Sequence, residues 1–291
     1  MTVRIVTDST AYLPAEVARR HAIEVVPLHV VVGGKDRVEG QDITPDEVAR
    51  ALREYTIVTT SRPTPQAFAE TYERLAAEGA TGIVSIHLSA QMSGTVEAAR
   101  LAAEEARVPV EVIDSETIGM AMGYAVIAGA EAASEGADIA AVQAAVQARL
   151  KPSGVLFYVD TLEHLRRGGR IGAASALLGS ALAIKPILAV RAGRIVPVEK
   201  VRTSSRAIAR IEALVVEHVK AGGVAVDIAV HHLDAGDRAE AIAAQLRQLV
   251  PEARQVIVVE LGAVVGAHVG PGTVAIAVSP RPDEPAGAQQ A

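Results

Sequence analysis

Short apolar runs alternate with longer amphipathic segments through the first half of the chain. The short runs are rich in β-branched residues and predict strands, whereas the longer segments carry apolar residues at helical spacing. Strands separated by helices in this way indicate βαβ units and a largely parallel sheet. The predicted strands are 3–7, 25–32, 81–87 and 110–113, and the predicted helices are 14–21, 65–78, 95–107 and 118–133. A further helix opens at Thr44, which has the spacing of a capping box with Glu47.

The second half follows a different pattern, because a hairpin-like turn at 192–194 joins two apolar runs. The predicted strands are 155–159, 187–191, 195–201, 224–231, 255–260 and 274–278, and the predicted helices are 139–150, 162–167, 173–182, 204–220 and 238–249. We therefore expect a two-domain α/β protein, with a mostly parallel sheet and flanking helices in residues 1–150. Residues 151–280 would form an α/β (α+β) domain with a mixed sheet. The polar, Pro- and Gly-containing residues 281–291 predict a flexible tail.

One apolar stretch, 261–279, contains no Asp, Glu, Lys or Arg, and its only titratable side chain is His268. Its β-branched flanks predict two strands joined by a turn that contains Gly266, His268, Gly270, Pro271 and Gly272. We therefore reject a transmembrane helix despite the length. Glycines that allow positive φ, together with Pro271, give a backbone that can present an imidazole and N–H groups to an anion. A plain Gly-Pro turn between two core strands is the alternative.

The composition excludes several classes of protein. With 291 residues, 50% hydrophobic and 21% charged, the chain is globular and long enough for about two domains. A net charge of −6, 2% aromatic residues and no Trp argue against nucleic-acid binding. The absence of Cys excludes disulfides, thiolate metal sites and a cysteine nucleophile. The first residues lack the apolar core of a signal peptide, so we expect a cytoplasmic protein without stable membrane insertion.

Three segments rich in hydroxyl side chains lie beside predicted elements: 7–10, 59–65 and 89–95. In the second segment, two prolines stiffen the chain and hold the hydroxyls of Thr60 and Ser61 in place. In the third segment, Ser93 and Thr95 flank Gly94, which frees backbone N–H groups. These groups together form a cradle for a carboxylate or oxyanion at a helix N-terminus. An ordinary turn explains the first segment better, and an N-cap explains the third equally well. In the second segment, capping explains Thr64 but not the Thr60-Ser61 pair.

Several catalytic motifs are absent or incomplete. The chain has no G-x-x-x-x-G-K-[ST] run and therefore no P-loop. Ser93 is not a nucleophile elbow, because Gln91 and Thr95 stand where that motif needs glycines. His231 and His232 are adjacent on a predicted strand and point to opposite faces, so we expect no metal site there.

Basic residues gather at 166–170, and Arg202 after the predicted hairpin is similar in kind. Guanidinium groups in such positions can dock an acidic partner or a phosphate. A solvated helix end explains Arg166 and Arg167 equally well.

Taken together, these segments resemble the DegV family of bacterial fatty-acid-binding proteins, the FakB-type subunits of fatty acid kinase. The resemblance covers nearly the whole chain, and its motifs keep the family's order. They are TDST at 7–10, TSRPTP at 60–65, LSAQMSGT at 88–95, VIDS at 112–115, LRRGGRI at 165–171, KPIL at 185–188 and GAVVGAHVGPGT at 262–273.

The resemblance implies a long-chain fatty acid, of the palmitate, oleate or stearate class, in an apolar tunnel between two α/β domains. It implies that Thr60 and Ser93 hydrogen-bond the carboxylate, with His268 beside them. A separate ATP-dependent kinase subunit would phosphorylate the bound carboxylate, and this protein would carry the acyl phosphate to phospholipid synthesis. Arg170 and Arg202 match basic positions on the face that meets the kinase.

We therefore expect a fatty-acid carrier that is not itself an enzyme and needs no cofactor. Its carboxylate site would comprise Thr60, Ser61, Ser93, Gly94 and His268.

One departure from the family pattern lies within this site: TSQPS is usual, whereas TSRPT stands here. Arg62 therefore either strengthens anion binding or points to solvent.

Two other functions compete with the carrier. A serine-type hydrolase or acyltransferase would use Ser93 and His268, with Asp114 as the third member of a triad. A regulatory or structural α/β protein would use the polar loops only as caps and turns.

Overall fold

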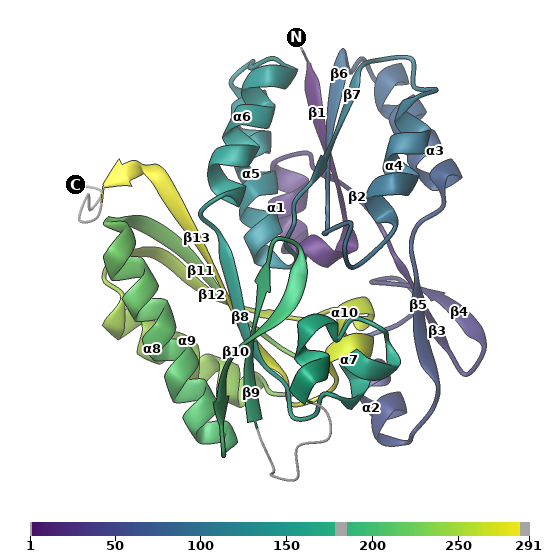
Figure 1. The fold of residues 1–291 in the computed structure, drawn as a ribbon. Helices are drawn as coiled ribbons and strands as arrows, with labels where there is room; N and C mark the ends of the chain where they lie inside the picture. The colour runs from purple at the N-terminus through teal and green to yellow at the C-terminus, as the bar shows by residue number, and fades with distance from the viewer. Residues whose placement is uncertain (1, 178–184, 286–291) are drawn as a thin grey trace.

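The computed structural model describes residues 2–177 and 185–285, and Figure 1 shows two α/β halves, each built around its own sheet. The N-terminal sheet has four parallel strands in the order β2-β1-β6-β7. Their bounds are β1 Val3–Asp8, β2 Glu24–Val26, β6 Gly82–His87 and β7 Val110–Asp114. The loops after β1, β6 and β7 leave the sheet on the side that faces the C-terminal half (Figure 1), and ligands of parallel sheets bind at such edges.

Helices cover both faces of this sheet, because successive strand residues point to opposite sides. Val6 and Ile83 are buried on the side of α3 and α4, whereas Ile5 and Val84 are buried on the side of α5 and α6. The helices of this half are α1 Ala15–Arg20, α2 Pro45–Arg53, α3 Pro65–Ala77, α4 Thr95–Ala103, α5 Met120–Ser134 and α6 Ile139–Leu150, with a 3-10 turn η1 at Ser9–Ala11. The capping box of Thr44 and Glu47 at the start of α2 is confirmed.

The C-terminal sheet is mixed, as predicted. Its six strands have the order β10-β9-β8-β13-β11-β12, and only β11 and β12 pair in parallel. The strands are β8 Gly154–Tyr158, β9 Lys185–Arg191, β10 Arg194–Val201, β11 Val224–His232, β12 Ala253–Glu260 and β13 Val274–Pro285. The helices are α7 Glu163–Arg167, α8 Ser204–Gly222, α9 Gly236–Leu249 and α10 Ala263–Val269. The hairpin turn between β9 and β10 is confirmed, with positive φ at Ala192 and Gly193.

The helix α5 lies between the two sheets and joins their cores. Met122 and Val126 belong to the core of the N-terminal sheet, whereas Ala121 and Tyr124 pack with the C-terminal sheet. The other face of the C-terminal sheet is covered by α8 and α9 (Figure 1). Residues 120–130 of α5 are apolar on both sides of the helix, and this part is stable here because both of these sides are buried.

A third, small sheet has the order β4-β3-β5 and corrects two predictions from the sequence. Its strands are β3 His29–Val32, β4 Lys35–Val38 and β5 Val58–Ser61. The single strand predicted at 25–32 is wrong, because Pro27 divides it between β2 in the large sheet and β3 in the small one. No strand was predicted around Thr60, whereas this segment forms β5 and pairs with β3.

Of the two strands predicted across 261–279, the first is wrong. Residues Ala263–Val269 form α10, and only the second run becomes a strand, β13. Backbone N–H groups at the start of α10 donate to distant side chains, Val264 to Glu39 at 2.8 Å and Val265 to the hydroxyl of Tyr12 at 3.3 Å. These long-range contacts outweigh the local preference of the β-branched residues for strand. The predicted turn is right only for 270–272, with positive φ at Gly270 and Gly272, whereas Gly266 and His268 lie in α10.

The helix predicted at 173–182 and the tail predicted at 281–291 also differ from the structure. The helix predicted at 173–182 is a 3-10 helix, η2, at Gly172–Leu177, and residues 178–184 lie outside the described residues. β13 continues to Pro285, so 281–285 are paired strand rather than tail, and 286–291 lie outside the described part. The predicted division at residue 150 falls between α6 and β8 and stays a prediction. Within residues 2–177 and 185–285, every helix is too short or too polar to cross a membrane.

Candidate ligand-binding site

A cavity lies between the two halves of the molecule. Its walls come from the loops at the edge of the N-terminal sheet, from β5, from the C-terminal sheet and from α10. Most of these walls are apolar: Leu28, Leu88, Met92, Ile118, Val155, Phe157, Leu165, Val190, Ile195, Leu261, Val264, Val265, Val269 and Ala275.

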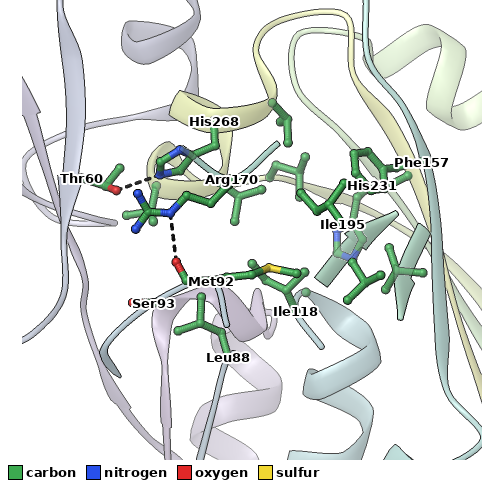
Figure 2. Close-up of a pocket in the computed structure, with 18 of the residues that line it drawn as sticks. Thr60, Leu88, Met92, Ser93, Ile118, Phe157, Arg170, Ile195, His231 and His268 are labelled. Atoms are coloured by element: carbon green, nitrogen blue, oxygen red, sulfur yellow. Dashed lines mark hydrogen bonds between the residues drawn. The ribbon is translucent and has the colours of Figure 1, made fainter. Parts of the chain in front are cut away.

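Polar side chains gather at one end of this cavity. Figure 2 shows Thr60, His268, Arg170 and Ser93 together at that end, away from Phe157. Ser61 and Arg62 also line the cavity and are exposed, which places its mouth at this end. Of the predicted carboxylate site, Thr60, Ser61, Ser93 and His268 therefore meet in one wall of the cavity.

The contact between Thr60 and His268 joins residues that lie far apart in the sequence. Thr60 Oγ1 and His268 Nε2 are 2.8 Å apart, the first on β5 and the second in the last turn of α10. The other ring nitrogen, Nδ1, is buried beside Gly168, where a Cβ would collide with it. Nδ1 has no hydrogen-bond partner among the described residues.

The imidazole of His268 is neutral near pH 7. Burial, and then the positive charge of Arg170, lower the pKa of His268 from 6.5 to about 4. When the neutral ring carries its proton on Nε2, it donates to Thr60 and leaves the Thr60 hydroxyl hydrogen free for another acceptor. The pair can therefore offer a hydroxyl donor to an anion in the cavity.

Ser93 and Gly94 have different places at the polar end of the cavity. Ser93 is half-buried in the cavity wall, and its hydroxyl lies 2.8 Å from that of Thr95 in the first turn of α4. Gly94 is the N-cap of α4, and a Cβ there would collide with the guanidinium of Arg62. The glycine therefore makes room for Arg62, whose charge lies at the mouth of the cavity and not away from the site.

The two arginines predicted to face a partner are placed differently. Arg170 is half-buried in the cavity wall, where its Nε donates to the carbonyl oxygen of Met92 at 2.9 Å (Figure 2). A second nitrogen, Nη1, donates to the carbonyl oxygen of Gly168 at 2.6 Å. Arg202 is exposed just after β10. Arg170 thus fixes the polar end internally, whereas Arg202 lies on the surface.

The geometry does not assemble the triad of the hydrolase alternative. Asp114 accepts from the backbone N–H groups of Ala90 at 3.2 Å and Glu116 at 2.9 Å, so it orders its own loop. His268 has Nδ1 beside Gly168, where a triad needs a carboxylate. Ser93 is bonded to Thr95 and not to the imidazole. In residues 2–177 and 185–285, no three His, Asp or Glu side chains gather as metal ligands.

His231 also lines the cavity, although it was not predicted as a site residue. It lies at the apolar end of the cavity, near Ile195 and Phe157 (Figure 2), and only 1% of its surface is exposed. Its Nε2 accepts from the backbone N–H of Met120 at 3.1 Å, and burial lowers its pKa to about 4. The pattern of β11 contains a signal for this position, because His231 alternates with apolar residues on a buried strand.

Two α/β halves around an apolar cavity with one polar end define a class of small-molecule-binding protein. The chain belongs to the DegV family: the family model described as "Uncharacterised protein, DegV family" matches residues 2–281. A DegV domain-containing protein of Streptomyces coelicolor is 54% identical over 279 residues, which are 96% of this chain and 99% of that relative.

Solved structures support the same assignment. The structure named "Fatty Acid Binding of a DegV family Protein from Thermus thermophilus" is 34% identical, with a TM-score of 0.91 over 97% of this chain and 100% of that one. The structure of "DegV, a fatty acid binding protein from Bacillus subtilis" is 32% identical, with a TM-score of 0.89 over the same shares of the two chains. The resemblance to the DegV family and the predicted fold class are confirmed.

Proposed function

We propose that this chain binds a long-chain fatty acid of the palmitate, oleate or stearate class in the cavity between its halves. The observation that carries the proposal is the division of one cavity into an apolar length and a polar end. The names of the Thermus thermophilus and Bacillus subtilis relatives, which state fatty-acid binding, support it.

The two parts of the cavity have separate tasks in this proposal. Each methylene of an acyl chain that enters the apolar part contributes about 0.8 kcal/mol, so the chain supplies most of the affinity. The carboxylate accepts from the hydroxyls of Thr60 and Ser93, with Ser61 and Gly94 beside it at the mouth. His268 turns the hydroxyl of Thr60 toward the ligand, and Arg62 and Arg170 add positive charge.

We propose further that the bound carboxylate is presented to a separate ATP-dependent kinase subunit. A carboxylate oxygen attacks the γ-phosphorus of ATP, the bond to the β–γ bridging oxygen breaks, and ADP leaves with that electron pair. The protein would be a cytoplasmic carrier of the acyl phosphate for phospholipid synthesis. The family resemblance, the exposed mouth at Ser61 and Arg62, and the exposed Arg202 support this role.

Ligand binding is tested directly on protein purified from a bacterial host. Denaturing mass spectrometry should detect a fatty acid, and delipidated protein should bind oleate. The carboxylate site is tested by Thr60→Ala, with Thr59→Ala as its matched control, since the two side chains point to opposite faces of β5. Empty protein that also fails to bind oleate and palmitate would overturn the proposal.

The kinase step needs its own measurement, because binding does not establish it. Arg202→Ala should bind oleate as the wild type does, yet support less ATP-dependent acyl-phosphate formation when the kinase subunit is added. Equal phosphorylation of oleate bound to wild type and to Arg202→Ala would remove Arg202 from the partner face.

A further inference from the structure

The helix α10, which carries His268, is held at both of its ends by side chains of the N-terminal half. At its C-terminal end His268 contacts Thr60, and at its N-terminal end the backbone N–H of Val264 donates to Glu39 Oε1 at 2.8 Å. α10 lies beside α2 and the small sheet (Figure 1), and both contacts come from that region.

Glu39 is built into this junction. Its side chain is buried, and its second oxygen accepts a hydrogen bond from the hydroxyl of Ser9. The Ser9 hydroxyl oxygen itself accepts from the backbone N–H of Leu28 at 3.0 Å, so the carboxyl group is fixed from both sides. Burial raises the pKa of Glu39, and the bonds from Ser9 and Val264 oppose that rise.

The chain backbone approaches Glu39 more closely than a side chain would allow. At Gly262, the residue before α10, a Cβ would collide with Glu39 Oε1 and with the ring of Tyr12. The hydroxyl of Tyr12 accepts from the backbone N–H of Val265 at 3.3 Å, which is a second hydrogen bond to the first turn of α10. The start of α10 is therefore fixed in position by tight packing as well as by hydrogen bonds.

The contacts that fix the two ends of α10 come from the same small sheet. Glu39 directly follows β4, Thr60 lies on β5, and both strands pair with β3 in the small sheet. α10 has seven residues and is about 10 Å long, so fixing both ends leaves it no room to pivot. Without the hold at Glu39, the helix could rotate about the contact between Thr60 and His268.

We propose that Glu39 is a positioning residue of the carboxylate site, which sets the place of His268 against Thr60 by fixing the first turn of α10. This proposal rests on the proposed function for its effect on ligand affinity. Its effect on the His268 ring does not depend on any ligand.

The test compares Glu39→Ala with Glu39→Gln in the full chain, by oleate affinity and by ¹⁵N resonances of the His268 ring. Glu39→Ala removes the acceptor of the Val264 N–H, so we expect at least tenfold weaker oleate binding and shifted His268 resonances. The amide oxygen of Glu39→Gln can still accept from Val264, so oleate affinity should return to within threefold of wild type. Glu212→Ala is the matched control, because Glu212 is a buried glutamate of α8, far from α10.

Unchanged His268 resonances in Glu39→Ala would overturn the proposal, whether or not oleate affinity falls. Wild-type protein that fails to bind oleate would contradict the proposed function, while the His268 resonances would still test the role of Glu39. Should Glu39→Ala not fold, Gly262→Ala introduces a methyl group into the same junction with Glu39 retained. Shifted His268 resonances in Gly262→Ala would support the proposal, and unshifted ones would overturn it.

Discussion

His268 and His231 line opposite ends of one cavity, and the same physical cause acts on both. Burial lowers the pKa of each ring to about 4, so each is neutral near pH 7. Their partners differ: Nε2 of His231 faces a backbone N–H, whereas Nε2 of His268 faces a hydroxyl. A backbone N–H can only donate, so the proton of His231 must sit on Nδ1. A hydroxyl can donate or accept, so His268 can change tautomer when a ligand arrives.

The comparison indicates that burial alone does not make a histidine functional. His231 stabilises the junction between α5 and β11 by pairing the Met120 N–H. His268 instead contacts the hydroxyl of Thr60 in the cavity wall, and we propose that it turns this hydroxyl toward a ligand. The predictions below separate these two roles, beginning with the largest effect.

His231→Ala should lower the free energy of unfolding by about 3 kcal/mol. The substitution leaves the buried N–H of Met120 without its acceptor and opens a cavity in the core. Urea denaturation at pH 7 measures the change, with the half-buried neighbour His232→Ala as control. A loss below 1 kcal/mol in His231→Ala would contradict the structural role.

Thr60→Ala and Ser93→Ala should each weaken oleate binding roughly 10- to 100-fold, because a hydrogen bond to a charged group contributes about 1.5–3 kcal/mol. Titration calorimetry on delipidated protein measures the affinity. A fatty alcohol of the same length carries no charge, so the same substitutions should weaken its binding less. Equal losses for acid and alcohol would show that these hydroxyls do not bind a carboxylate.

Both histidines should make the protein less stable in acid. A ring whose pKa is lowered on folding stabilises the native state fully above its unfolded pKa of about 6.5, and that stability is lost as the pH falls toward 4. The unfolded chain binds more protons in this window, so stability rises with pH. Between pH 7 and pH 5, the titration of each ring lowers the free energy of unfolding by roughly 2 kcal/mol.

Single variants separate the two contributions to this acid sensitivity. In His268→Gln, the difference in unfolding free energy between pH 7 and pH 5 should be smaller than in the wild type by roughly 2 kcal/mol. The same decrease is expected in His231→Gln. A variant with an undiminished difference would show that its histidine titrates normally in the folded protein.

Arg170→Met should have the smallest effect. The positive charge of Arg170 is the second cause of the lowered pKa of His268, after burial, and it does not act on His231. The pKa of His268, followed by NMR, should rise by less than about one unit. This rise corresponds to a change of under about 1.4 kcal/mol in the free energy of protonating the ring. A parallel rise at His231 would point to a general loosening of the cavity.

The sequence was sufficient for those features that depend on local chemistry. The capping box at Thr44, the hairpin at 192–194 and the alternation of strands with helices all follow from neighbouring residues. The motifs around Thr60, Ser93 and His268 were found because they are short and contiguous. The structure brings all three into one cavity wall, whereas their roles toward a ligand stay predictions.

Other features depend on residues that are distant in the chain. Val264 and Val265 favour a strand locally, yet they form a helix because Glu39 and Tyr12, more than 200 residues earlier, accept from their N–H groups. Glu39 carries no recognisable motif, so its contact with α10 could not be read from its neighbours. The cavity role of His231 depends in the same way on where the two halves meet.

The contact between Thr60 and His268 also has a consequence for the timing of synthesis. These residues are 208 positions apart, and a ribosome that adds about 5–20 residues per second needs roughly 10–40 s to cover that distance. A nascent chain therefore exposes half of the polar end long before the other half exists. β13, which pairs with β8 and β11 within the C-terminal sheet, follows α10 still later. Translation arrested before α10 would yield only chains that cannot close the cavity.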